Sequence, residues 1–417
     1  MNTLNNTCLR RLQGRGIYKK ESPSVMSNAK YLGMLCICMM SISYAKGQSE
    51  PVSAKYEGYV YKPAKVEATD ERIQSLKIPE GFTIQKFADQ LGKPRMLAVT
   101  EDGKVYVTDR EQGVIYLLED ADKDGRAEKK QVVLNKENVH GVAIHRNELY
   151  YVTVKEVYKA PIEQNGALGE EETIINDLPD GGQHPNRTLY FGPDDKLYVT
   201  VGSTCNACDE TNPENATIVQ TNPDGSGRKV YAKGLRNTIG IDWHPTTGEM
   251  YGLDHGIDWL GNTEQKEELN IIKADANYGW PYIYADGKKN IADEPKEGYE
   301  AFKAKTTLPV MLLEAHSAPM NLLFYTGNQF PEEYQQHAFA TLHGSWNRET
   351  PVGYKVVSIQ FENNKPTKYV NFLSGFLVEG GKQQFGRVVG LAQYTDGSLL
   401  ISDDENGIIY RISYQDN

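Results

Sequence analysis

The chain has 417 residues and a formal net charge of −11. Hydrophobic residues make up 39% of it and charged residues 24%, which is an ordinary globular composition and excludes a disordered or collagen-like protein. An acidic surface repels phosphate backbones, so we do not expect nucleic acid as a partner.

The N-terminus has the pattern of a targeting segment. Lys30 precedes an apolar run over residues 31–42, and Ser43 and Ala45 then place small residues where a signal peptidase cuts. The run is too short to cross a bilayer. We therefore predict that residues 1–45 are a leader with a cleaved secretory signal, with a buried segment as the alternative. The protein would be periplasmic or secreted, without stable membrane insertion after cleavage.

Only two cysteines remain after such a cleavage, because Cys8, Cys36 and Cys38 all lie in the leader. Cys205 and Cys208 form the motif Cys-Asn-Ala-Cys. In an oxidising compartment this spacing favours a local disulfide. A catalytic redox pair would need the cysteines at the start of a helix, whereas the surrounding residues are typical of a loop.

The rest of the chain repeats one unit, in which an apolar segment, a polar turn and an alternating strand follow one another. The unit recurs over residues 97–119, 141–162, 189–203, 240–256, 322–346 and 390–412. Six such units predict an all-β fold, a six-bladed β-propeller with four-stranded antiparallel blades, over residues 78–417. An array of β-sandwiches is the alternative. Residues 46–77 lack the repeat and are predicted to be an N-terminal extension, and only residues 331–336 are expected to be helical.

Several loops next to predicted strands carry residues suited to chemistry or to ligand binding. These residues are His184, Arg236, Asn237, His343, Arg348 and Arg387. The loops of a propeller gather at one face, so residues far apart in the sequence can meet there. Histidine titrates near neutral pH and can act as a base, and arginines bind carboxylates through a planar fork. Each residue taken alone is also compatible with an ordinary surface position or an inter-blade salt bridge.

Two segments have features of calcium sites. The loop at Gly256 and Ile257 can present backbone carbonyl oxygens, which calcium accepts as ligands. Asp120, Asp122 and Asp124 alternate before a glycine, as in the first half of an EF-hand loop. The twelfth position of that loop is Gln131 instead of glutamate, so a plain acidic turn remains an equal alternative.

Five strings in order resemble those of one family. They are GGQHPNRTLYFGPDDKLYVTVGSTCNAC, GLRNTIGIDWHPTTGEMYGLDHG, EELNIIKADANYGWP, HGSWNRETPVGYKVV and FGRVVGLAQYTDGSLLISDDENGIIYRI. Over residues 78–413 the chain is similar to the glucose/sorbosone dehydrogenases, which are soluble sugar dehydrogenases dependent on pyrroloquinoline quinone (PQQ), and it looks closest to their sorbosone-dehydrogenase-like branch.

The resemblance implies a six-bladed propeller that holds PQQ and Ca²⁺ and oxidises an aldose or a sugar aldehyde, passing electrons to an external acceptor. It implies that His184 is the general base, that Arg236, Asn237 and Arg387 contact the quinone, and that the carbonyls of Gly256 and Ile257 bind calcium.

The chain departs from the family pattern at three places. Ser203 stands where the family has an aspartate that orients the base, and Val389 stands in place of a second arginine. The family's quinone-binding lysine has no clear match, and Arg348 or His343 is the expected substitute. The departures at Ser203 and Val389 keep open a non-catalytic propeller that binds carbohydrate or acts as a scaffold. A calcium-dependent sugar lactonase is a separate alternative, but such enzymes hold a central metal with Glu, Asn and Asp side chains, and no such set is evident beside His184.

Overall fold

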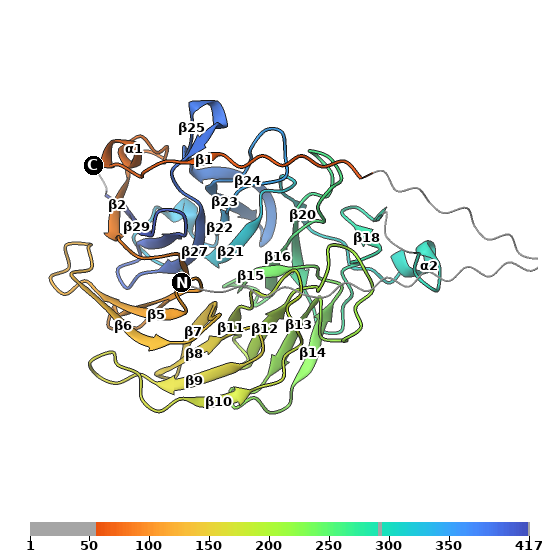
Figure 1. The fold of residues 1–417 in the computed structure, drawn as a ribbon, viewed down its shortest axis with the longest axis horizontal. Helices are drawn as coiled ribbons and strands as arrows, with labels where there is room; N and C mark the ends of the chain where they lie inside the picture. Colours follow the sequence, from red (N-terminus) through yellow and green to blue (C-terminus); the bar gives the residue numbers. More distant parts are fainter. Residues whose placement is uncertain (1–55, 291–293, 416–417) are drawn as a thin grey trace, which may run out of the picture. The chain divides into compact units, whose positions relative to one another are not determined.

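Six four-stranded antiparallel sheets form the blades of a propeller in the computed structural model, which describes residues 56–290 and 294–415. Figure 1 shows the blades following one another around a central axis. The innermost strands are β3 (Pro94–Val99), β7 (Gly141–His145), β11 (Leu189–Phe191), β15 (Thr238–Trp243), β21 (Pro319–Phe324) and β27 (Val388–Gln393). The predicted all-β six-bladed fold is confirmed.

Each of the first five blades is completed by three strands that follow its innermost strand in the chain. These are β4 (Val105–Asp109), β5 (Val114–Glu119) and β6 (Lys129–Asn135) in blade 1; β8 (Glu148–Val152), β9 (Val157–Pro161) and β10 (Glu172–Ile175) in blade 2; β12 (Leu197–Val201), β13 (Thr217–Thr221) and β14 (Lys229–Lys233) in blade 3; β16 (Met250–Asp254), β17 (Glu268–Ile272) and β20 (Met311–Leu312) in blade 4; and β22 (Ala338–Leu342), β23 (Lys355–Glu362) and β24 (Lys365–Leu373) in blade 5.

Blade 6 joins the two ends of the propeller. It contains β27, β28 (Leu399–Asp403) and β29 (Ile408–Tyr414), and its outermost strand is β2 (Phe82–Ala88) from the other end of the chain. The pairing of β2 with β29 is antiparallel and places Phe82 opposite Tyr414. The Phe82 ring packs edge-on against Phe330 and Phe372 of blade 5, at centroid distances of 4.8 and 5.1 Å.

The segment before β2 packs outside the sheets. Its strand β1 (Ala64–Lys65) pairs in parallel with β26 (Gln383–Gln384), which also pairs with β25 (Leu377–Val378). The helix α1 (Asp70–Gln74) follows, capped by the Thr69 side chain. The predicted leader and the first ten residues of the predicted extension lie outside the described residues.

The other elements of the described part are short. The expected helical piece is the 3₁₀ turn η1 (Glu332–Tyr334), whereas α1, α2 (Tyr299–Lys303) and the 3₁₀ turn η2 (Glu379–Gly381) were not predicted, because helices of three to five residues leave no periodic apolar pattern. The hairpin of β18 (Ile283–Tyr284) and β19 (Lys288–Lys289) lies within an insertion of blade 4. Among the described residues, no helix has the length and apolar character that a membrane span requires.

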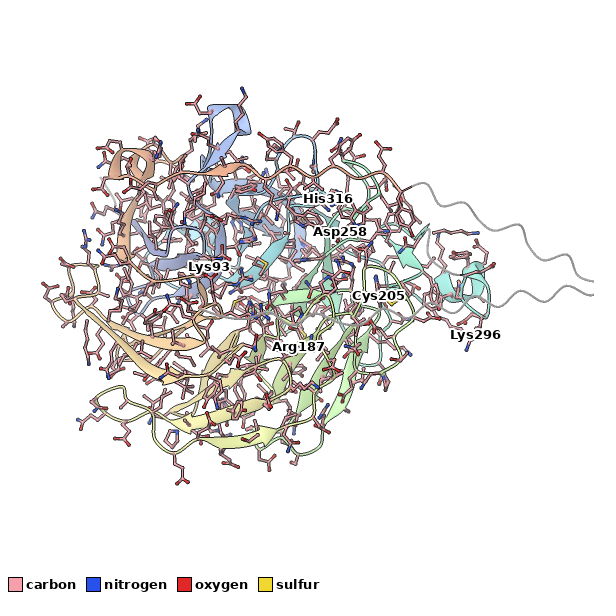
Figure 2. The ribbon with its side chains drawn as sticks, in the orientation of Figure 1. Lys93, Arg187, Cys205, Asp258, Lys296 and His316 are labelled. Atoms are coloured by element: carbon pink, nitrogen blue, oxygen red, sulfur yellow. A yellow bond between two sulfur atoms is a disulfide. The ribbon has the colours of Figure 1, made fainter. Side chains whose placement is uncertain are left out.

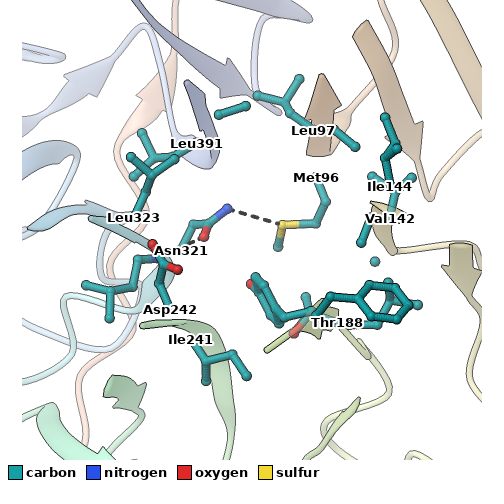
Figure 3. Close-up of a pocket in the computed structure, with 18 of the residues that line it drawn as sticks. Met96, Leu97, Val142, Ile144, Thr188, Ile241, Asp242, Asn321, Leu323 and Leu391 are labelled. Carbon is teal, nitrogen blue, oxygen red and sulfur yellow. Dashed lines mark hydrogen bonds between the residues drawn. The ribbon is translucent and has the colours of Figure 1, made fainter. Parts of the chain in front are cut away.

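One end of the central channel is a cavity of about 320 Å³ between the innermost strands (Figure 3). Most of the side chains that line it are apolar, and Asn321 reaches across to the Met96 sulfur at 3.8 Å. Asp242 lies in this wall and accepts hydrogen bonds from the backbone N–H groups of Trp243 and Phe324. Burial raises the pKa of Asp242 to about 7.

Truncating the Phe82 side chain tests how far the stability of the protein depends on the closure of the propeller by β2. We expect Phe82→Ala to lower the free energy of unfolding by about 3–5 kcal/mol, because the cavity it leaves is lined by rings of two blades. Val132→Ala is the matched control on β6, where the side chain is 43% exposed, and should cost about 0.5 kcal/mol or less. Urea unfolding measures both, and equal losses would contradict a closure role for Phe82.

Asp242 should make stability depend on pH. Its pKa is higher in the folded than in the unfolded chain, so its favourable contribution is complete below about pH 4 and is lost as the pH rises through about 7. We expect the stability of the wild type relative to Asp242→Asn to fall over that interval. Urea unfolding at pH 4.5, 6 and 8 measures the difference, and a constant difference would show that Asp242 ionises normally.

Candidate active site

The other end of the channel is a polar cavity of about 400 Å³. Its wall comes from the loops that precede the innermost strands and from the loops that follow the second strands, so side chains from distant parts of the chain meet there. They include Arg95, His184, Arg236, His316, His343 and Arg387. Asp258 and His316, labelled in Figure 2, belong to blades 4 and 5 and both line this cavity.

His184 is held with one ring nitrogen turned to the protein. Its Nδ1 lies 2.8 Å from the Ser203 carbonyl oxygen and 2.9 Å from the Ser203 hydroxyl. A carbonyl only accepts, so Nδ1 carries the proton and Nε2 has a free lone pair. Nε2 has no hydrogen-bond partner among the described residues. Burial, and next the charge of Arg236, lower the pKa of His184 to about 2, which keeps the ring neutral.

The loop of His184 is fixed by close backbone packing. The buried Arg187 donates to the carbonyls of His184 at 2.8 Å and Pro179 at 3.1 Å. Gly202 on the neighbouring segment has no room for a side chain, because a Cβ there would lie 2.6 Å from the Cβ of His184. These contacts fix the position of the His184 backbone.

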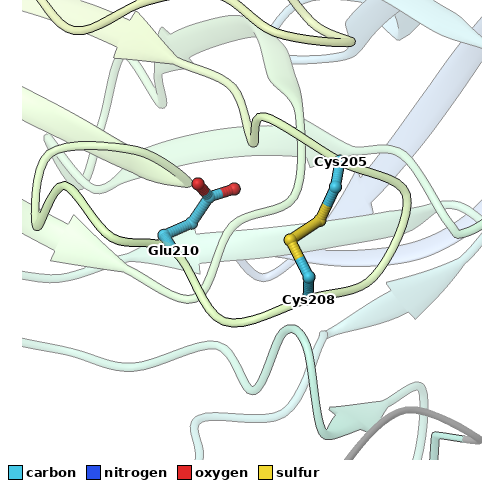
Figure 4. Close-up of side chains that lie close together, drawn as sticks. All are labelled: Cys205, Cys208 and Glu210. Carbon is cyan, nitrogen blue, oxygen red and sulfur yellow. A yellow bond between two sulfur atoms is a disulfide. The ribbon is translucent and has the colours of Figure 1, made fainter.

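The Cys205–Cys208 segment supports the same histidine. In the structure these two cysteines form a disulfide, with Glu210 beside it (Figure 4). The Ser203 hydroxyl donates to the Cys205 carbonyl at 2.7 Å, so its oxygen is left to accept from His184. Glu210 instead binds the N–H and hydroxyl of Thr204, so the serine, and not this carboxylate, contacts the His184 ring.

Arg236 and Asn237 form one wall of the cavity. Asp254 accepts from both of their backbone N–H groups, at 2.9 and 2.8 Å, and so fixes the turn that presents their side chains. The Arg236 guanidinium donates to Asn206 and, at 3.2 Å, to Asp258. Its Nη1 has no hydrogen-bond partner in the described part of the chain and remains as a donor for a ligand.

Arg387 and His343 line another part of the cavity wall. Arg387 donates to the carbonyls of His343 and Gly344, at 3.2 and 2.7 Å, and its Nη1 has no partner among the residues described. His343 donates to Asp404 at 2.8 Å, and Arg95 pairs with the other oxygen of that carboxylate. Burial acts to raise the pKa of Asp404, but His343 and Arg95 outweigh it and hold this pKa below its usual range.

Gly256 lines the cavity next to Ile257, and both are held from behind. Their N–H groups donate to Glu267 and Gln265 at 2.8 and 2.9 Å. Neither carbonyl oxygen accepts a hydrogen bond from the described residues. Gly256 lines the cavity, whereas the buried Ile257 is not among the residues of its wall. Asp258 and Glu267 line the same cavity, and burial raises the pKa of Glu267 to about 8. Oxygen donors of this kind suit calcium.

Some predicted site residues are not at this cavity. Arg348 does not line it, because its guanidinium donates to the Ala315 carbonyl at 3.2 Å and lies beside Glu314. Of the two expected substitutes for the missing lysine, only His343 is therefore in place. Val389 is buried in the apolar core. Asp120, Asp122 and Asp124 form a separate cluster on blade 1.

The sequence analysis missed several residues of the cavity wall. Arg95 lies at the start of the innermost strand of blade 1. Arg236 and Arg387 lie just before the innermost strands of blades 4 and 6, so a search for arginines at the start of every innermost strand would have identified Arg95 from the sequence. His255 directly precedes Gly256, where only the backbone carbonyl was predicted to bind a ligand. His316 lies in no motif, so the sequence gives no reason to select it over the other histidines. His255 donates to the Pro319 carbonyl, and burial lowers its pKa to about 4.

Comparisons with known proteins agree with this architecture. Residues 76–415 match the TrAA12-like family. An uncharacterised protein of Borreliella burgdorferi is 31% identical, over 84% of this chain and 93% of its own length. A pyrroloquinoline quinone-dependent pyranose dehydrogenase of Coprinopsis cinerea is 22% identical, and the match covers 81% of this chain but only 54% of that protein.

Solved structures share the fold. The calcium structure of the Trichoderma reesei family AA12 enzyme superposes with a TM-score of 0.72 at 21% identity, covering 82% of this chain and 97% of that one. The holo form of the Coprinopsis cinerea pyranose dehydrogenase PQQ domain gives 0.71 at 20% identity, covering 85% and 100%. The match over residues 76–415 and the six-bladed fold together place the chain in the TrAA12-like family, within the superfamily of PQQ-dependent glucose/sorbosone dehydrogenases that its motifs resemble.

Proposed function

We propose that this protein is a PQQ- and calcium-dependent dehydrogenase that oxidises a sugar or a sugar aldehyde. The observation that carries the proposal is the neutral His184, whose unprotonated Nε2 belongs to a cavity with unpaired arginine donors on its walls. Related proteins are named as quinone-dependent sugar dehydrogenases, which supports the same chemistry.

His184 is the residue that takes the substrate proton. Its Nε2 accepts the proton of a sugar hydroxyl when the attached carbon loses its hydride, and Nδ1–H stays on the Ser203 oxygens. A pKa near 2 makes the ring a weak base, and the charge of Arg236 is the second cause of that low value. An anionic ligand that pairs with Arg236 would therefore raise the pKa of His184 and strengthen it as a base.

Arg236, Asn237 and Arg387 are the residues that would hold the quinone. The Nη1 groups of the two arginines have no hydrogen-bond partner among the described residues, and both residues line the cavity, so together they suit a planar ligand with several carboxylates. The carbonyls of Gly256 and Ile257, with Asp258 beside them, would hold calcium. When bound, the quinone supplies the hydride acceptor and the calcium ion polarises it. Electrons then leave to an external acceptor.

Export belongs to the same proposal. Residues 1–45 have the pattern of a secretory signal, and the Cys205–Cys208 disulfide that supports Ser203 persists in an oxidising compartment. In the periplasm or outside the cell, the disulfide would stay oxidised and the contacts between Cys205, Ser203 and His184 would be kept.

The first experiment is dye reduction by the purified protein with PQQ, calcium and a panel of aldoses and sorbosone. We expect activity only with quinone, and a loss of about 10²–10⁴-fold in kcat for His184→Gln, the range in which a general base contributes. His337→Gln is the matched control, because His337 lies before β22, away from the cavity, and should leave kcat unchanged.

The same experiment separates the other functions. Release of a hydroxy acid from a sugar lactone without quinone would replace the proposal with hydrolysis. Sugar binding without oxidation, in the presence of bound quinone, would leave a carbohydrate-binding propeller. Failure of PQQ to bind would remove the cofactor from the proposal.

Ser203 should matter for turnover more than for binding. In Ser203→Ala the backbone carbonyl still accepts from Nδ1–H but the hydroxyl is lost, so we expect kcat to fall by about 2–10-fold, the worth of one hydrogen bond, with KM for the sugar unchanged. Steady-state kinetics measure this split. An unchanged kcat would mean that the carbonyl alone positions His184.

A further inference from the structure

A cluster of four carboxylates lies on the loop between β5 and β6 of blade 1. Asp120, Asp122, Asp124 and Glu128 each offer an oxygen, and these oxygens all lie within 4.8 Å of one another. None of the four residues lines the polar cavity. The cluster is therefore separate from the candidate active site.

Asp120 is the unusual member, because it is buried and incompletely paired. Its side chain is 2% exposed, and its Oδ1 has no hydrogen-bond partner among the described residues. Its Oδ2 accepts from the Gly125 N–H at 3.0 Å, and the nearest recorded cation, Arg411, is 4.0 Å away from it. A buried carboxylate oxygen with no donor is costly unless it binds a cation.

The loop has the backbone that such a ligand set needs. Gly125 has a φ of +92°, and a Cβ there would lie 2.0 Å from atoms of both Gln85 and Arg411, so only glycine fits. Asp122 and Asp124 each accept a backbone N–H through Oδ1, from Asp124 at 3.1 Å and from Arg126 at 2.8 Å. Each therefore keeps its second oxygen for a ligand.

We propose that Asp120, Asp122, Asp124 and Glu128 bind a calcium ion. Four carboxylates in a partly exposed loop match the hard, oxygen-rich coordination of calcium, whereas magnesium requires a smaller and more regular octahedron. Glu128 occupies the ninth position of the loop and supplies the fourth carboxylate, in the absence of the usual glutamate at position 131.

The position of the loop gives the site a structural role. Gln85 of β2 donates to the Gly125 carbonyl at 2.8 Å, and the Ala127 N–H donates to the Phe87 carbonyl at 2.7 Å. Arg411 of β29 lies beside Asp120. The loop thus contacts both strands that close the ring, and a bound cation stabilises the junction of blades 1 and 6.

The test compares calcium binding and thermal stability in the full protein. We expect Asp122→Asn/Asp124→Asn to bind one calcium ion fewer per chain than the wild type by calorimetric titration. Calcium should also raise the melting temperature less in this variant, with half-maximal stabilisation at a calcium concentration at least about tenfold higher. Glu101→Gln/Glu137→Gln removes the same charge from exposed positions of blade 1 and should behave as the wild type.

Two further measurements separate the loss of this calcium ion from misfolding and from an effect on the proposed active site. Asp120→Asn removes the buried ligand and should lose the same calcium ion, and circular dichroism checks that each variant is folded. Quinone-dependent sugar oxidation at saturating calcium should survive in Asp122→Asn/Asp124→Asn, which separates this site from the proposed active-site calcium. Equal calcium stoichiometry and equal calcium-dependent stabilisation in the wild type and in both cluster variants would overturn the proposal.

Discussion

The pairing of β2 with β29 is the contact on which the rest of the structure depends. A propeller has no single core, and each blade packs only on its two neighbours, so the ring holds its geometry only if the first and last sheets are joined. Here the joint is one strand from the N-terminal side hydrogen-bonded to the C-terminal strand, with Phe82 packed against rings of blade 5. Closure fixes the distance between blades and hence the width of the channel.

The two ends of the channel differ in chemistry because of the direction of the innermost strands. All six run from the polar end to the apolar end, so the loops that precede them collect at one mouth. Arginines and histidines occupy those loops, whereas the opposite cavity is walled mostly by strand side chains such as Met96 and Leu391. The arginines that could bind a carboxylate ligand therefore lie at the end with the polar cavity.

Buried charges around the polar cavity hold each other in place. Asp404 accepts from His343 and pairs with Arg95, and Asp254 fixes the backbone that carries Arg236. Such pairs are costly to bury, and they orient side chains with little freedom. The His184 ring is set in the same way, by a carbonyl and a hydroxyl that hold Nδ1. Burial and the charge of Arg236 lower the pKa of His184 and keep the ring neutral.

The sequence by itself determined the repeat, the blade type and most of the site. Alternating strands and polar turns are local signals, so six hairpin units could be counted, and the rule that propeller loops share a face brought His184, Arg236 and Arg387 together. Only the tertiary structure decided the rest. It showed that β2 closes blade 6, that the Ser203 carbonyl and hydroxyl both contact His184 Nδ1, and that Arg348 turns away to Glu314. These features depend on contacts between residues far apart in the chain or on the direction of a side chain, and neither leaves a periodic pattern in the sequence.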